Sequence, residues 1–215
     1  MQSDELPELH YIAPIANLPS IVQRGLLCHR QAESLNPISV ALGSVQERRK
    51  AVRIPGGLPL HNYVNLYLNA RNPMMYLRKD EHEELVVLRI ETRVLRRPGV
   101  VVTAGNAARK LARFYSPEPG LAVIHSMDLF AQYWSNSGNP ERDDRMKDLR
   151  CAEALIPHQL PMSEVFGAYV SCDNTFDRVT TLLPAHEVKI SAEMFFQRPG
   201  VVNASRTGRN WGTRP

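Results

Sequence analysis

The pattern of apolar and polar positions predicts a series of short strands. In residues 64–69 apolar and polar side chains alternate, which is the period of a strand with one face toward water. Residues 85–95 form the most strand-like run of the chain. We expect the remaining strands at residues 11–15, 100–103, 152–156, 165–171 and 187–195.

Helical spacing predicts short helices between these strands. Asn17 is placed to cap a helix that buries Ile21 and Val22 and ends at Gly25. Residues 28–45 lack periodicity and are expected to form a loop, with a helix beginning near Ser44. We expect further helices at residues 106–115, where Asn106 would be the first residue, within 121–134 and at 176–183.

Strands separated by short helices, without regular βαβ alternation, indicate an α+β fold. We expect one domain over residues 1–198. Residues 199–215 are rich in Gly, Arg, Asn and Thr and are expected to form a flexible basic tail.

The net charge says little about function, whereas the positions at which basic residues cluster say more. The net charge is +4, and three of those charges come from arginines of the tail, Arg206, Arg209 and Arg214. A nearly neutral body does not by itself indicate a nucleic-acid-binding protein. Basic side chains gather instead at residues 48–53 and 142–150. Either cluster could equally be a solvated helix face.

Composition excludes some classes and sets a compartment. No apolar run approaches the roughly 18–20 residues that a membrane helix needs. The three cysteines, Cys28, Cys151 and Cys172, lack CxxC spacing, which argues against zinc and against a disulfide framework. We therefore expect a cytoplasmic protein, without a metal and without a membrane partner, and expect a monomer.

Four segments together resemble one known family. They are Gln46–Lys50 (QERRK), residues 54–57 (IPGG), Tyr63–Tyr76 (YVNLYLNARNPMMY) and Ala152–Pro157 (AEALIP). In this order they resemble the DarT family of DNA ADP-ribosyltransferases, over about residues 10–195. The resemblance implies an ADP-ribosyltransferase-like fold with a split mixed β-sheet core and short helices. It also implies transfer of ADP-ribose from NAD, as co-substrate, to thymidine or guanosine in single-stranded DNA. A toxin or anti-phage role and a macrodomain antitoxin as partner are further implications.

The resemblance makes Glu153 and Arg49 the catalytic residues. Cleavage of the nicotinamide–ribose bond creates an oxocarbenium-like centre, which a carboxylate can stabilise. Glu153 stands in a strand-like segment, a rigid position for such a group; the alternative is a Glu that pairs with an Arg at a strand edge. Arg49 matches the family's essential arginine, which binds the phosphates of NAD. Arg48 and Lys50 are its rivals, and all three could simply cover a helix.

The remaining site residues also follow from the resemblance. Tyr11, Ala13 and Asn17 align with the nicotinamide pocket, where Tyr11 and Ala13 replace a histidine and a threonine and would act through their backbone. Tyr67 aligns with a tyrosine that can stack on nicotinamide, although a strand tyrosine is often only packing. For single-stranded DNA we expect phosphate contacts, a polar group near the target base and an apolar shelf for an unpaired base from Arg71, Met74, Tyr76, Thr103, Asn106 and Lys147.

Two other classes stay open. The first is a related enzyme that acts on RNA, either an RNA ADP-ribosyltransferase or an RNA 2′-phosphotransferase, and the latter would depend on several phosphate-binding Arg and His residues. The second is a nucleic-acid-binding module that kept the fold and lost NAD binding, for which Ala13 and Pro14 give a reason. Taken alone, Met74 would most often be core and Asn106 a helix cap.

Overall fold

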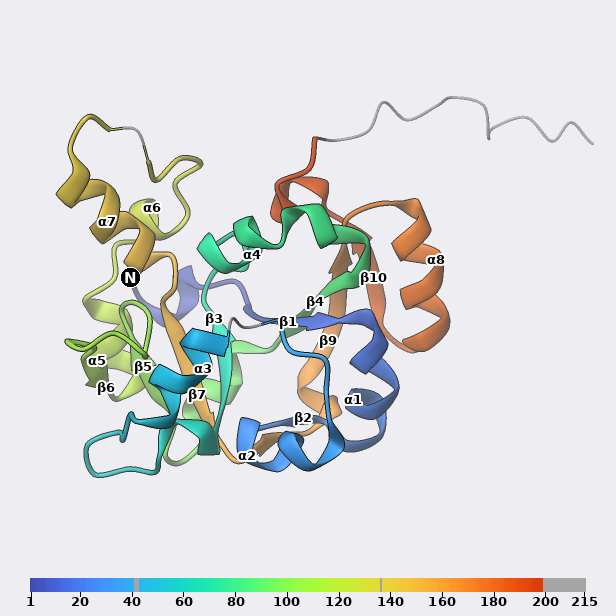
Figure 1. The fold of residues 1–215 in the computed structure, drawn as a ribbon, viewed down its shortest axis with the longest axis horizontal. Coiled ribbons are helices and arrows are strands. Elements are labelled where there is room, and N and C mark those ends of the chain that lie inside the picture. Colours follow the sequence, from blue (N-terminus) through green and yellow to red (C-terminus); the bar gives the residue numbers. More distant parts are fainter. Residues whose placement is uncertain (41–42, 136, 199–215) are drawn as a thin grey trace, which may run out of the picture.

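One eight-stranded sheet organises the molecule, in the order β10-β9-β4-β1-β3-β7-β5-β6 (Figure 1). The computed structural model describes residues 1–40, 43–135 and 137–198. Neighbouring strands are antiparallel except for the parallel pair β9–β10. The strands of the sheet are β1 (Leu9–Pro14), β3 (Tyr63–Tyr67), β4 (Leu85–Ile90), β5 (Val101–Thr103), β6 (Phe114–Tyr115), β7 (Glu153–Pro157), β9 (Val165–Val170) and β10 (Glu187–Ile190); β2 (Leu26–Leu27) and β8 (Gln159–Leu160) pair separately.

The sheet is split between β1 and β3. Six residue pairs join β1 to β4 and five join β3 to β7, but β1 and β3 share one pair, His10 with Tyr67. The two half-sheets therefore diverge from this point and leave the facing sides of β1 and β3 available to a ligand. This arrangement, with its short helices, confirms the predicted α+β fold with a split mixed sheet.

Residues 63–67 keep the predicted alternation, since Val64 and Leu66 are buried in the core while Asn65 and Tyr67 are half-buried on the other face.

Short helices cover the sheet and its ends. The helices are α1 (Leu18–Arg24), α2 (His29–Ala32), α3 (Gly43–Lys50), α4 (Pro73–Leu77), α5 (Pro117–Ala122), α6 (Ser126–Leu129), α7 (Pro140–Leu149) and α8 (Asp173–Leu182). The 3₁₀ turns are η1 (Ser3–Glu5), η2 (Ile15–Asn17), η3 (Glu33–Leu35), η4 (Leu60–Asn62), η5 (Lys79–Glu84), η6 (Thr92–Arg96), η7 (Met162–Glu164) and η8 (Ala192–Phe195).

Strand β4 carries a buried cation, Arg89, that is paired with two acids. Arg89 donates from Nε to Glu8 at 2.8 Å and from Nη1 to Glu187 at 2.8 Å. Its guanidinium also lies over the rings of Phe166 and Tyr169, 4.5 and 4.7 Å from their centroids. A charge can stay inside a sheet when each of its donors has such a partner.

Several predicted elements are wrong in extent or type. The strand expected over residues 85–95 ends at Ile90 and continues as η6, and the strand expected over 187–195 ends at Ile190 and continues as η8. The expected loop at 28–45 contains α2 and η3, and the helical spacing in 121–134 corresponds only to the short α6. Val22 is exposed rather than buried.

The predicted helix at residues 106–115 is absent. Its first residue, Asn106, accepts a hydrogen bond from the backbone N–H of Ala108 at 2.8 Å, two residues along the chain. This local turn competes with a helix for the same backbone groups. The segment then continues through turns into β6, so its basic side chains do not form a helix face.

Within the described residues, no helix is both long and apolar enough to cross a bilayer. The tail at 199–215 lies outside the described residues, and its predicted separation from the domain stays a prediction.

Candidate active site and nucleic-acid interface

Glu153 opens β7 in the interior of the sheet. Its cross-strand neighbours are Tyr67 of β3 on one side and Thr103 of β5 on the other. The residue is 1% exposed. A carboxylate fixed between two paired strands has little freedom to change its orientation, which suits a group that must face a reacting atom.

The side chain of Glu153 accepts hydrogen bonds from two elements. Arg49 of α3 donates from Nη1 to Oε1 at 3.1 Å and to Oε2 at 3.0 Å, and the backbone N–H of Ala107 donates to Oε1 at 3.3 Å. Arg49 is buried, while its neighbours Arg48 and Lys50 are exposed. Among the basic residues 48–50, Arg49 is thus the one whose side chain binds Glu153. The ion pair considered for a strand edge does form, but in the interior of the sheet.

Burial sets the protonation of the groups around Glu153. It raises the pKa of Tyr67 far above its ordinary value, and the charge of Glu153 raises it further. Burial also raises the pKa of the Cys151 thiol to about 12, with Glu153 and Asp148 adding to the shift. Both groups are therefore neutral at pH 7, so neither the phenol nor the thiol can serve as the nucleophile or base.

A cavity of about 340 Å³ lies where the two half-sheets diverge. Four of the predicted NAD residues line it together, namely Tyr11, Ala13, Asn17 and Tyr67. Met74, predicted for the DNA site, lines this cavity as well and packs partly against the core. Arg49 does not belong to the lining, since it is turned toward Glu153. The face of β3 that was predicted to be solvent-exposed, with Asn65 and Tyr67, thus forms one wall of this cavity.

Asn17 holds a loop over that cavity. Its Nδ2 donates to the carbonyl of Ile38 at 2.8 Å, and the N–H of Ile38 donates to its Oδ1 at 3.2 Å. The predicted side-chain cap on α1 is absent, because both ends of the amide are bonded to Ile38. Asn17 therefore shapes the cavity by pinning residues 36–40.

A histidine pair, of which His29 lines this cavity, was not predicted. The ring of His29 lies 4.1 Å from that of His61. Burial lowers the pKa of His61, and the nearby His29 and Arg49 lower it further. His61 is thus neutral at pH 7, and its Nε2 is buried without a hydrogen-bond partner among the described residues. Thirty-two residues separate the two histidines, and no local pattern in the sequence joins them.

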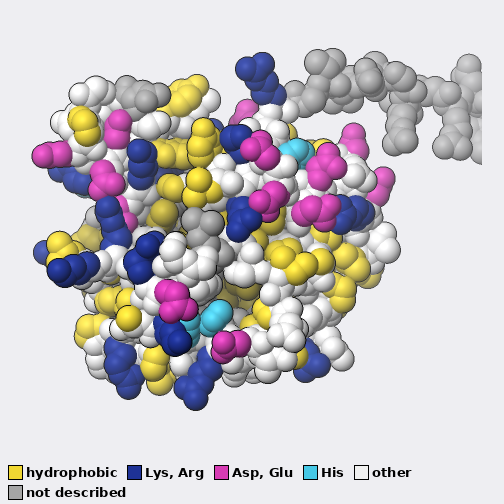
Figure 2. Space-filling model, viewed as in Figure 1, with side chains coloured by type: hydrophobic (Ala, Val, Ile, Leu, Met, Phe, Trp, Pro, Cys, Tyr) yellow, Lys and Arg dark blue, Asp and Glu magenta, His cyan; other side chains and the backbone are white. Residues whose placement is uncertain are grey.

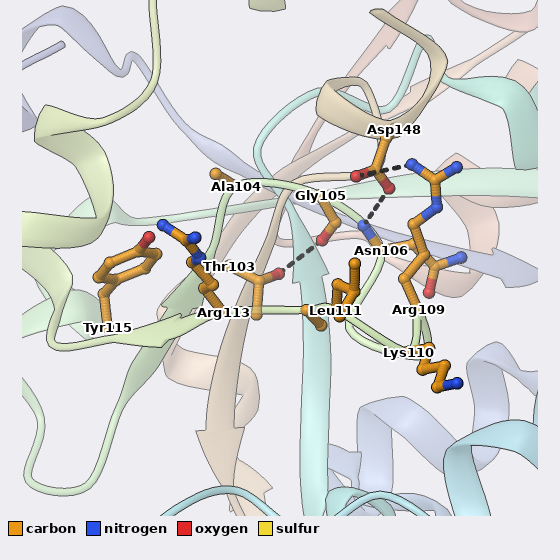
Figure 3. Close-up of a pocket in the computed structure, with 11 residues that line it drawn as sticks. Thr103, Ala104, Gly105, Asn106, Arg109, Lys110, Leu111, Arg113, Tyr115 and Asp148 are labelled. Carbon is orange, nitrogen blue, oxygen red and sulfur yellow. Dashed lines mark hydrogen bonds and ion pairs between the residues drawn. The ribbon is translucent and has the colours of Figure 1, made fainter. Parts of the chain in front are cut away.

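A second cavity, of about 510 Å³, is lined by the turn that follows β5 and by Asp148 of α7 (Figure 3). Thr103, which faces Glu153 across the sheet, donates from Oγ1 to the carbonyl of Gly105 at 2.6 Å. The backbone N–H of Asn106 donates to Asp148 of α7 at 3.0 Å. Thr103 and Asn106 therefore shape the turn at the cavity wall. The other charged or aromatic lining residues are Arg109, Lys110, Arg113 and Tyr115.

Lys147 lies in a neighbouring cavity of about 400 Å³. It shares that lining with Arg48, Asn106, Arg109 and Lys110. Figure 2 shows several Lys and Arg side chains on the left of this view, the side where Figure 1 places α7 and β5. Arg109 and Lys110 were not predicted as site residues, because their segment was interpreted as a helix; the basic run itself was the available signal.

Arg71 and Tyr76 lie apart from these cavities, near η8. Arg71 donates from Nη1 to Gln132 at 2.7 Å and from Nε to Glu193 at 3.1 Å, both backbone carbonyls. Tyr76 is half exposed and meets Phe196 edge to face. The predicted DNA residues thus fall into three places: Met74 at the first cavity, Thr103, Asn106 and Lys147 at the cavities beside α7, and Arg71 and Tyr76 near η8.

Comparison with known proteins decides the family. The sequence pattern described as "ssDNA thymidine ADP-ribosyltransferase, DarT" matches residues 10–196. The chain belongs to the DarT family. This confirms the predicted family and supports the predicted enzyme class.

The curated proteins that match the chain include two described as DNA ADP-ribosyl transferases. A DNA ADP-ribosyl transferase–DNA ADP-ribosyl glycohydrolase fusion protein of Thermosipho africanus is 28% identical over 170 residues, which are 76% of this chain and 42% of the fusion protein. The chain therefore spans less than half of the fusion protein's length. A DNA ADP-ribosyl transferase of Thermus sp. is 28% identical over 188 residues, 81% of this chain and 86% of that protein.

Solved DarT structures share the fold. Thermus sp. 2.9 DarT in complex with ADP-ribosylated ssDNA superposes with a TM-score of 0.77 at 25% identity, over 90% of this chain and 98% of that one. The same Thermus protein in complex with NAD+ superposes with a TM-score of 0.72 at 23% identity, over 88% of this chain and 98% of that one. This second comparison supports the fold.

Proposed function

We propose that this DarT-family protein transfers ADP-ribose from NAD to a base of single-stranded DNA and releases nicotinamide. The buried Arg49–Glu153 pair carries the proposal. Glu153 pairs with Tyr67, which lines the cavity at the sheet split that we assign to NAD, and with Thr103, which lines one of the cavities beside α7 that we assign to DNA. A group whose strand neighbours line both cavities is in position to act on donor and acceptor.

Groups at the first cavity, and Arg49 beside Glu153, have tasks toward NAD. The backbone of Tyr11 and Ala13 on β1 is available to the nicotinamide carboxamide, and the ring of Tyr67 to the nicotinamide face. Arg49 holds the Glu153 carboxylate and is the cation nearest to the NAD phosphates in this proposal. The replacements Ala13 and Pro14 leave the backbone of β1 intact, since β1 still pairs with β4 along six residues.

The transfer step is a substitution at the anomeric carbon of the nicotinamide ribose. The bond from that carbon to nicotinamide breaks, and nicotinamide leaves with the electron pair. Glu153 stabilises the oxocarbenium-like centre by its negative charge. A ring or exocyclic nitrogen of the base forms the new bond, and its proton passes to Glu153. Tyr67 and Cys151 stay protonated at pH 7 and cannot accept this proton. Glu153 is therefore the general base of the reaction in this proposal.

We propose thymidine as the modified nucleoside. Its support is the description of the matching family, which names thymidine. Guanosine stays the alternative, because thymine and guanine both carry an N–H that Glu153 could deprotonate. Oligonucleotides that contain one thymidine or one guanosine, incubated with NAD, distinguish the two by the mass and position of the adduct.

The same assay tests the enzyme class. We expect ADP-ribose on the DNA oligonucleotide, free nicotinamide in equal amount and neither product with Glu153→Gln. An adduct on RNA of the same sequence but not on DNA would make the protein an RNA ADP-ribosyltransferase. DNA binding without nicotinamide release would make it a binding module.

We also propose a partner that removes the modification. The Thermosipho relative joins a DNA ADP-ribosyl transferase to a DNA ADP-ribosyl glycohydrolase in one chain. A separate glycohydrolase with a macrodomain would serve this protein in the same way if the transferase acts as a toxin or anti-phage effector. Co-expression that restores the growth of cells producing the active transferase, with loss of the DNA adduct, tests this pairing.

A further inference from the structure

Arg150 is a buried cation that pairs with no acid among the described residues. It follows α7, and its side chain is 1% exposed. Nη1 donates to the backbone carbonyl of Arg71 at 3.4 Å. Nε and Nη2 are buried and have no hydrogen-bond partner among the residues that the structure describes. Such an arrangement is costly, because each unpaired buried donor has lost its water.

The contrast with Arg89 shows that this is not how the protein usually buries an arginine. Arg89 meets the carboxylates of Glu8 and Glu187. At Arg150 no described acid raises the pKa: burial lowers it to about 10, with the nearby Arg71 contributing to the decrease. Arg150 still carries its charge at pH 7, beside a second cation. Two neighbouring cations, of which Arg150 has unpaired donors, are typical of a site that binds an anion.

Trp134 covers both cations. Its ring centroid lies 4.9 Å from the guanidinium carbon of Arg150 and 5.5 Å from that of Arg71. Arg71 also lies 4.4 Å from the ring of Phe196. The aromatic rings stabilise the cations while no anion is bound. Trp134 itself is half-buried, so its ring has one side on which a base could stack.

The unpaired atoms of Arg150 form one edge of its guanidinium. Nε and Nη2 point in the same direction, and this edge makes paired hydrogen bonds to two oxygens of a phosphate. NAD has its own cavity at the sheet split, and neither Arg71 nor Arg150 lines it. A phosphate from another ligand is therefore the anion that fits.

We propose that Arg71, Trp134 and Arg150, here called the tryptophan-covered arginine pair, bind a phosphate of the single-stranded DNA substrate. Trp134 moves off Arg150 when the strand binds, and its ring then stacks on an unpaired base. The inference rests on the proposed function, since it takes the DNA of that reaction as the ligand. Arg150 is a binding residue and takes no part in breaking the bond to nicotinamide.

Substitution of Arg150 by Met tests the site, with Arg24→Met as the matched control. Arg24 is exposed at the end of α1, away from α7 in Figure 1. We expect Arg150→Met to weaken binding of a short oligothymidylate about 10-fold at low salt. The slope of log Kd against log salt should fall by about 0.7, the value for one single-strand phosphate. KM for NAD should stay unchanged, and Arg24→Met should change none of these quantities.

Thermal unfolding separates this role from a structural one. An unpaired buried cation contributes little to stability, so we expect Arg150→Met to keep or raise Tm. A variant with lower Tm and wild-type DNA affinity would overturn the inference. If Arg150→Met does not fold, Arg150→Lys replaces it: lysine keeps the charge but loses the paired contact, so DNA affinity should still fall. Wild-type affinity with Lys would also overturn the inference.

Tryptophan fluorescence gives a second readout on the folded protein. The sequence has two tryptophans, Trp134 and Trp211, so Trp211→Phe leaves Trp134 as the only reporter. We expect oligothymidylate, but not NAD, to quench this signal. An unchanged signal at saturating DNA contradicts the predicted stacking. If the wild-type protein neither binds nor modifies DNA, the proposed function fails; if it does both and Arg150→Met equals it, only this inference fails.

Discussion

Glu153 and Arg49 are two members of one buried ion pair, and removing the acid should affect chemistry and stability together. Glu153→Gln keeps the shape and removes the charge that stabilises the oxocarbenium-like centre. We expect the transfer rate to fall about 10²-fold or more. Buried Arg49 would then face a neutral amide, so the free energy of unfolding should fall by about 3 kcal/mol.

Two measurements check this variant. Mass spectrometry of the oligonucleotide gives the transfer rate, and urea unfolding gives the stability. A folded Glu153→Gln protein that modifies DNA at the wild-type rate would remove Glu153 from the mechanism.

Adjacent cations of α3 allow a matched comparison. Arg49 meets Glu153, whereas Arg48 is exposed and lines the cavity that contains Lys147. We expect Arg49→Met to lose NAD affinity and transfer together. Arg48→Met should leave KM for NAD unchanged and weaken only the binding of DNA. NAD titration and oligonucleotide binding, measured on both variants, decide between these positions; the opposite pattern would transfer the donor role to Arg48.

Glu8 predicts how stability depends on pH. Burial alone would raise its pKa, but hydrogen bonds from His10 and Arg89 outweigh it and lower the pKa to about 2. An unfolded Glu titrates near 4.3, so the unfolded chain binds the proton first as the pH falls. The ionised group therefore stabilises the fold by about 3 kcal/mol above pH 5, and this contribution is lost between about pH 5 and 2.

Substitution of Glu8 by Gln checks that dependence. The variant should be less stable than wild type at pH 7, and the difference should shrink as the pH falls toward 2. Urea unfolding at several pH values measures it. A constant difference over this range would show that the contribution of Glu8 does not depend on its charge.

At the scale of elements, the turn after β5 depends on its contact with α7. A Cβ at Gly105 would lie 2.5 Å from Oδ2 of Asp148, so Gly105→Ala must push that carboxylate away. Asp148 would then release the N–H of Asn106 and the side chain of Arg109. The end of a side chain moves at little cost, so we expect Tm to change slightly while DNA affinity and transfer fall.

Gly43→Ala is the control for this turn, since an added methyl group there meets nothing within 4 Å. Binding of an oligonucleotide and KM for NAD, measured on both variants, test the assignment. Equal DNA affinity of Gly105→Ala and wild type would exclude this turn from the DNA interface.

The same turn shows where the sequence was sufficient and where it was not. The strand at residues 63–67 could be predicted because alternation is local and the core lies on one side of it. The helix at 106–115 could not be rejected from sequence, because the competing partners, Asp148 and Glu153, lie 42 and 46 residues away. The contacts of the Ala107 and Asn106 N–H groups with these distant carboxylates hold the segment as a turn.

At the scale of the molecule, the short segments identified the family, but only the fold shows how they meet. Residues 46–50, 63–76 and 152–157 are separate in sequence, and the sheet brings Arg49, Tyr67 and Glu153 together. The arginine pair had no sequence signal beyond a basic cluster, because the burial of Arg150 depends on packing from α7 and the segment around Trp134. The catalytic residues could be predicted from motifs. The placement of one cavity beside Tyr67 and another beside Thr103, the two strand neighbours of Glu153, could not.

The burial of Glu153 predicts a preference for unpaired DNA. Glu153 is 1% exposed and lies inside the sheet, so a base must leave its stack to approach it. In a duplex this costs a few kcal/mol, which corresponds to about 10²-fold in rate. We expect an oligonucleotide hairpin with the target base in its loop to be modified about 10²-fold faster than one with the same base in its stem. Mass spectrometry of the two hairpins, at equal concentration and salt, measures the ratio. Equal rates would mean that the protein itself extracts the base from the stem, and the predicted preference for unpaired DNA would be wrong.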